Sequence, residues 1–120
     1  MKIASFILII IIVLILRACS PVPANMSKDV YNAGITSLNT VDAYLKGNTD
    51  SNAALKELEK QFEIINNPYV TSNISAENLG VRLSIMNLIH LFYRIETVTI
   101  DNVLLERNAL AEKLGETVIQ

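Results

Sequence analysis

Four stretches of the chain repeat apolar side chains at spacings of three and four residues, and this periodicity constrains the fold more than any other feature. The clearest repeat lies between Asp50 and Ile65, where lysines and glutamates occupy the positions between the apolar ones. Such spacing places the apolar side chains on one face of an α-helix. The pattern therefore predicts an all-α fold in which these faces pack against one another.

Residues suited to helix ends flank the four stretches. Serine, aspartate and threonine are good N-caps, and glycine is a common residue just after a helix. We expect a break near Thr99, followed by a fourth helix to about Leu114. The alternative, one helix from Ala76 to Leu114, would be roughly 60 Å long and would overhang its partners. The predicted fold is a compact three- to four-helix up-down bundle over residues 27–120. The predicted caps are Ser27, Asp50, Ser75 and Thr99, and the predicted terminators are Gly47 and Gly115.

The N-terminal segment differs in composition from the rest of the chain. Met1 and Lys2 precede a run from Ile3 to Leu16 that is apolar except for Ser5. As a helix this run would span about 21 Å, which is short of the roughly 30 Å of a bilayer core. A short apolar run behind a positive charge is typical of a secretory signal. We therefore predict a signal peptide or membrane anchor at residues 1–18 and a proline-containing tether at residues 19–26.

The end of this segment, Leu16-Arg17-Ala18-Cys19, resembles the signal of bacterial lipoproteins. That signal has an aliphatic residue three places before the cysteine and a small residue directly before it; Arg17 occupies a place that is usually small or uncharged. The resemblance, to small helical bacterial lipoproteins, implies cleavage before Cys19 and lipid attachment to its thiol. It also implies an extracytoplasmic, membrane-anchored location in the cell envelope. Cleavage after Ala24 and an uncleaved anchor are the alternatives.

The charge of the remaining chain bears on its partners. Without Lys2 and Arg17, eight of the ten Lys and Arg residues remain against all twelve Asp and Glu residues, a formal net charge of −4. A mildly acidic domain without a basic cluster is a poor candidate for binding nucleic acid. Cys19 is the only cysteine, so an internal disulfide is excluded and packing must hold the fold.

The sequence contains no motif for catalysis, cofactor binding or metal binding. His90 is the only histidine, which excludes a site with several histidines within one chain. The apolar residues from Leu79 to Ile95 occupy most of a helix circumference, so we expect a central, buried helix with His90 in the core or at its edge. Tyr31 and Tyr93 are also predicted core residues. The glutamates at 57, 59 and 63 alternate with lysines and predict a solvated surface.

These observations favour a membrane-tethered helical interaction or structural module without catalytic activity. Its expected partners are the membrane, through a lipid on Cys19, and a protein of the cell envelope. Tyr69, in the longest loop, is the aromatic residue we expect to face such a partner. The alternative is a helical bundle that senses a small ligand or peptide, which predicts a cavity lined by Met86, His90 and Tyr93. His90 beside an acid in a cleft would instead indicate an enzyme.

Overall fold

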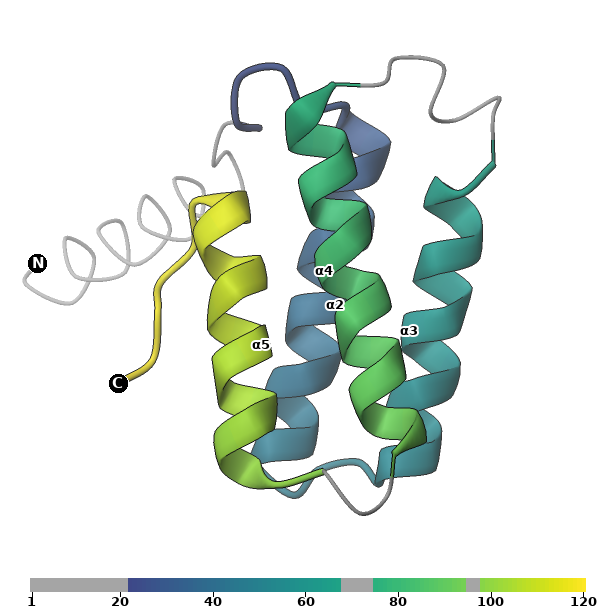
Figure 1. The fold of residues 1–120 in the computed structure, drawn as a ribbon, viewed down its shortest axis with the longest axis vertical. Helices are drawn as coiled ribbons and strands as arrows, with labels where there is room; N and C mark the ends of the chain where they lie inside the picture. The colour runs from purple at the N-terminus through teal and green to yellow at the C-terminus, as the bar shows by residue number, and fades with distance from the viewer. Residues whose placement is uncertain (1–21, 68–74, 95–97) are drawn as a thin grey trace, which may run out of the picture.

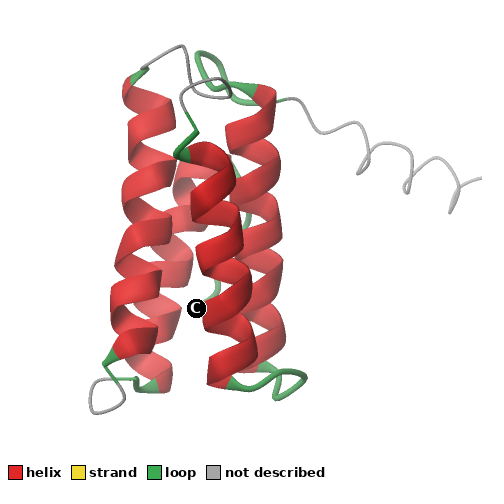
Figure 2. Cartoon of the chain, turned by 90° about the vertical axis from the view of Figure 1, so that its right-hand side faces the viewer, coloured by secondary structure: helices red, strands yellow, loops and turns green. Residues whose placement is uncertain are grey.

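The computed structural model describes residues 22–67, 75–94 and 98–120, which form four α-helices joined by loops, without a strand (Figure 2). The predicted all-α bundle is confirmed. The chain leaves the helical conformation between the third and fourth helices, so a single helix through to Leu114 is wrong. The helices are α2 (Lys28–Leu45), α3 (Ser51–Ile65), α4 (Ala76–Tyr93) and α5 (Ile100–Leu114).

Every helix begins at its predicted cap. In each case the capping side-chain oxygen accepts a hydrogen bond from the backbone N–H three residues further on, which satisfies a donor that the first turn leaves free. Gly115 ends α5 with φ of 73°, and Gly47 follows α2 with φ of 77°. Glycine takes this left-handed conformation without steric cost. The four caps are Ser27, Asp50, Ser75 and Thr99.

Helices that follow one another in sequence lie side by side and run in opposite directions (Figure 1). The ring closes where α5 packs against α2, and α2 also meets α4 across the centre of the bundle. The N-terminal ends of α2 and α4 therefore share one end of the bundle, and those of α3 and α5 share the other. This is an up-down four-helix bundle, and each helix keeps one side on the outside.

The core is apolar and draws on all four helices. On α2 the most buried positions include the small residues Ala33, Gly34 and Ser37, whereas Tyr31 and Ile35 are only half-buried. The predicted place of Tyr31 in the core is therefore only partly right, because the small side chains form the buried face and let the helix approach its neighbours closely. The fully or nearly fully buried apolar side chains are Val30, Val41, Ala54, Leu58, Ile65, Val81, Ile85, Leu88, Phe92, Val103, Leu110, Ala111 and Leu114.

A partly buried ion pair joins α5 to α2. Arg107, whose side chain is 7% exposed, donates to both oxygens of Asp42 at 2.8 and 3.1 Å. Arg107 also donates to the carbonyl of Thr117, and the amide of Asn108 both donates to and accepts from the backbone of Ile119. These bonds hold the C-terminal segment against α5.

The described part of the expected tether, residues 22–26, lies against the bundle. Val22 packs on the core, and Met26 is buried. The Ser27 N–H donates to the side chain of Asn78 at 2.9 Å, and the Ser75 hydroxyl donates to the carbonyl of Asn25 at 2.6 Å. The predicted signal or anchor at residues 1–18 lies outside the described residues. None of the described helices has both the length and the hydropathy that a bilayer span requires.

Candidate functional site

The two residues that the sequence singled out, Cys19 and Tyr69, both lie outside the described residues. Lipid attachment at the first and partner contact at the second stay predictions. The described residues direct attention instead to α4, the helix whose apolar side chains the sequence analysis assigned to the core.

α4 carries two apolar rows. The inner row faces the bundle and includes Val81, Ile85, Leu88 and Phe92, all buried. The outer row, here called the outer seam, consists of Leu79, Leu83, Met86, His90 and Tyr93. Its spacing is four, three, four and three residues, which is the heptad spacing of a coiled-coil contact line.

The outer seam is open to solvent. Leu79 is 47%, Leu83 49% and Tyr93 59% exposed, His90 is exposed and Met86 is half-buried. The prediction of a wholly buried α4 is therefore wrong for this face. α4 does meet all three other helices, but in a ring of four each helix keeps an outer side. His90 and Tyr93 are surface residues for the same reason, whereas the sequence predicts His90 in the core or at its edge and Tyr93 in the core.

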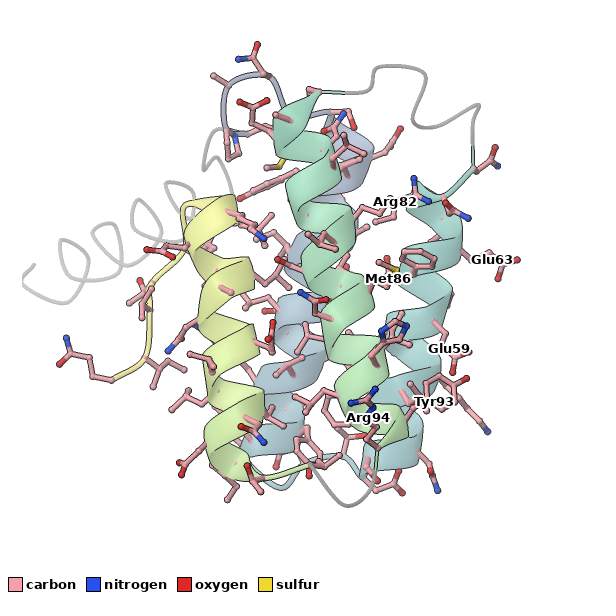
Figure 3. All side chains as sticks on the ribbon, in the orientation of Figure 1. Glu59, Glu63, Arg82, Met86, Tyr93 and Arg94 are labelled. Carbon is pink, nitrogen blue, oxygen red and sulfur yellow. The ribbon has the colours of Figure 1, made fainter. Side chains whose placement is uncertain are left out.

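On the α3 side, charged and aromatic groups border the outer seam (Figure 3). The Arg82 guanidinium lies over the ring of Phe62 on α3, 5.7 Å from its centroid. Lower down, the Tyr93 hydroxyl is hydrogen-bonded to Glu59; the negative charge of Glu59, then the hydrogen bond, raises the pKa of Tyr93. Glu63, one turn above Glu59, points away from α4 (Figure 3). On this border the cation, Arg82, lies above Met86, and the acid that contacts Tyr93, Glu59, lies below it.

On the α5 side, the outer seam borders an open groove of about 450 Å³. Glu106 of α5 lines the lower part of this face together with His90 and Arg94. Towards the other end, the Lys113 ammonium donates to the Gly80 carbonyl at 3.2 Å and to the Ser84 hydroxyl at 2.6 Å. On this border Lys113 lies above Met86 and shares a hollow with Glu77, and Glu106 lies below Met86 and shares the groove with Arg94.

The geometry does not assemble the other predicted sites. Met86 lines a separate hollow with Leu79, Arg82 and Leu83, and Tyr93 bonds to α3, whereas His90 lines the groove towards α5. The three residues named for a ligand cavity thus do not share either of these two hollows. His90 and Glu106 line one groove, but no hydrogen bond or ion pair joins them. Among the described residues, no group of His, Cys, Asp and Glu is arranged to hold a metal ion.

A signal for the outer seam was present in the sequence. The inner and outer rows of α4 each follow helical spacing, so the helix reads as apolar nearly all round. A buried helix and a helix with two contact faces share that pattern; the two polar residues of the second row, His90 and Tyr93, are what mark it as the outer one.

Comparison of the chain with protein-family models, with curated proteins and with solved structures finds no match.

Proposed function

We propose that this protein is a non-catalytic helix-docking module, held at the outer side of a membrane through Cys19, that binds its partner with the outer seam of α4. The observation that carries the proposal is the heptad row on α4, in which Leu79, Leu83 and Tyr93 expose about half or more of their side chains. Such a row fits an amphipathic helix, whose apolar side chains insert between those of the seam.

A comparison of the outward sides of α3 and α4 supports the choice of this face. The outward side of α3 carries Lys56, Glu59, Lys60 and Glu63, all exposed, as expected for a helix that faces water. The outward side of α4 instead exposes two leucines and a tyrosine. Aromatic and apolar anchors with charged groups at the border are the usual composition of a protein interface.

The docking function is tested in cells with the full chain. A photoreactive phenylalanine analogue replaces Leu83 on the outer seam or, as the control, Asn39, which is exposed on α2 at the opposite side of the bundle. We expect an adduct from position 83 that disappears when Leu79→Lys is added, and no such adduct from position 39. Equal yields from both positions, or an adduct insensitive to Leu79→Lys, contradict the proposal.

The tether is tested separately, by growing cells with radiolabelled fatty acid. We expect label on the parent chain and none on Cys19→Ala, with the parent in the membrane fraction. An unlabelled parent chain that keeps Met1 and stays in the membrane fraction indicates an uncleaved anchor instead. An unlabelled chain that begins at Asn25 indicates cleavage after Ala24. Neither result contradicts the proposed docking surface, because the tether and the outer seam lie in different parts of the chain.

A further inference from the structure

We infer that the outer seam binds a second copy of this chain, with the two α4 helices antiparallel and related by a twofold axis at Met86. This inference rests on the proposed docking function and names its partner. In such a pair the outer seam is its own complement: Leu79 faces Tyr93 of the second copy, Leu83 faces His90, and Met86 faces Met86. Leu79 and Tyr93 each lie seven residues from Met86, and Leu83 and His90 lie three and four residues from it, so the two halves of the seam match to within one residue.

The charges beside the seam select this orientation on the α3 side. Arg82 lies four residues before Met86, about 6 Å towards the N-terminal end of α4. Glu59 lies on the other side of Met86 (Figure 3), at the level that the Tyr93 hydroxyl reaches, since helical side chains lean towards the N-terminus. A twofold axis at Met86 exchanges these two levels. Arg82 of each copy therefore faces Glu59 of the other.

The α5 side repeats the relation with different residues. Lys113 lies at the level of Gly80 and Ser84, to which it bonds. Glu106 lines the groove at the level of His90. The same twofold axis therefore brings Lys113 of each copy opposite Glu106 of the other. Arg94 lines the same groove, and the axis brings it towards Glu77 of the other copy, which lines the hollow beside Lys113.

A parallel pair with the same seam is disfavoured by these charges. A twofold axis along α4 places the α3 border of one copy on the α5 border of the other at the same level. Arg82 then faces Lys113, and Glu59 faces Glu106, so both borders bring like charges together. Like charges across an interface suppress a wrong arrangement, and opposite charges set the orientation. In the antiparallel pair, the two contacts between Arg82 and Glu59 and the two between Lys113 and Glu106 are all attractive.

The antiparallel pair also fixes how the two copies meet a membrane. The N-terminal ends of the two bundles lie at opposite ends of the pair, since α2 and α4 begin at the same end of each copy. Two tethers reach one membrane only if the α4 helices lie along its surface. Confinement to that surface raises the effective concentration of the two copies, which a contact of about two heptads requires.

Disulfide trapping in the full chain at its membrane tests the pair. A Met86→Cys chain is expected to form a disulfide-linked dimer on mild oxidation, because the axis brings the two positions together. Leu79→Cys alone is expected to give none, since its two copies lie about 21 Å apart along the axis. A mixture of Leu79→Cys and Tyr93→Cys chains is expected to link. The parent chain, with Cys19 only, sets the background.

The charges provide a second test of the same contact. In the Met86→Cys background, Arg82→Glu or Glu59→Arg alone is expected to lower the dimer yield at subsaturating oxidation by roughly tenfold, since each change affects two symmetric pairs. The double exchange is expected to restore it. Both residues are exposed, and circular dichroism checks that each variant keeps its helices.

The outcomes separate this inference from the docking function. Linkage of Leu79→Cys to itself overturns the antiparallel arrangement in favour of a parallel one. No linkage from Met86→Cys, together with a seam-dependent adduct of position 83 to another protein, overturns self-pairing and leaves docking intact. No linkage and no seam-dependent adduct overturn both.

Discussion

Gly34 and Gly80 both lie inside helices, but an added methyl group meets different surroundings at the two positions. A Cβ at Gly34 on α2 would lie 2.7 Å from Cδ2 of Leu114 and 3.2 Å from Cγ1 of Val81. A Cβ at Gly80 on α4 would have the Lys113 side chain as its nearest neighbour, at 3.6 Å, which is an ordinary contact. Alanine substitution at the two positions therefore separates the backbone effect from the packing effect.

The expected magnitudes have opposite signs. Alanine in place of glycine inside a helix stabilises by about 1 kcal/mol. Extra atoms in a close-packed core cost about 1–3 kcal/mol, and Leu114 and Val81 are both buried, with little room to move. We expect Gly34→Ala to lower the free energy of unfolding by about 0–2 kcal/mol and Gly80→Ala to raise it by about 1 kcal/mol. The difference between the variants isolates the packing cost.

The measurement is urea unfolding of the full chain in mild detergent, followed by far-ultraviolet circular dichroism. A shift of the midpoint at constant slope reports a change in stability alone. If both alanine variants stabilise by the same amount, α2 does not approach α4 and α5 as closely as the structure has it. That result would refute the explanation of the small residues on α2, and with it the tight contact across the centre of the bundle.

Three further predictions concern buried or half-buried polar groups. Ser37→Ala is expected to raise the free energy of unfolding by about 1 kcal/mol, because the buried hydroxyl has no hydrogen-bond partner among the described residues; Ser84→Ala, which loses a hydrogen bond, is expected to lower it in the same urea assay. Arg107→Leu is expected to lower it by about 2–3 kcal/mol, because its carboxylate partner stays partly buried without a cation, and to speed hydrogen exchange in residues 117–119. Burial, then the carboxylate of Glu116, raises the pKa of Tyr31 above 10.0. The protonated hydroxyl therefore contributes to the free energy of unfolding below pH 10, and this contribution is lost as the pH rises through the folded-state pKa. Tyr31→Phe is expected to reduce the loss of stability at alkaline pH, and an unchanged pH dependence of stability would contradict the prediction.

The helix boundaries were predictable because their causes are local. A cap such as Ser27 bonds to a backbone N–H three residues away, and Gly115 reverses the chain at its own φ. Both effects are contained in a few consecutive residues. The up-down order followed from the short connections between the helices, which leave antiparallel neighbours as the simple arrangement.

The contacts between distant residues were not predictable in the same way. Asp42 has Lys46 one turn away on its own helix, yet it pairs with Arg107, which is 65 positions distant in sequence. The absence of a surface pair between Asp42 and Lys46 changes the free energy of unfolding little, since exposed ion pairs contribute at most about 1 kcal/mol. The buried guanidinium, in contrast, needs a carboxylate once packing has placed it between α2 and α5. Packing therefore decides the pairing, and packing depends on the whole fold.

The sequence did not predict which row of α4 faces the core, for a different reason. A helix with a polar face can turn only that face to water, so its orientation follows from its sequence. The apolar side chains of α4 point in nearly all directions, and the pattern alone leaves the buried row undetermined. In the bundle, the row with Val81 and Phe92 packs inside, and the row with Leu83 and His90 stays outside.

The outer seam is therefore not a requirement of the fold. Surface substitutions usually change stability by no more than about 0.5 kcal/mol, and the neighbouring outward side of α3 shows that this bundle carries charged residues there, such as Lys60 and Glu63. Exposed leucines at Leu79 and Leu83 bring no comparable burial to the monomer, because about half of each side chain stays in water. Their contribution to free energy is realised only when another apolar surface covers them. The exposure of these leucines supports the proposal that the face serves association and that the charges beside it select the partner and its orientation.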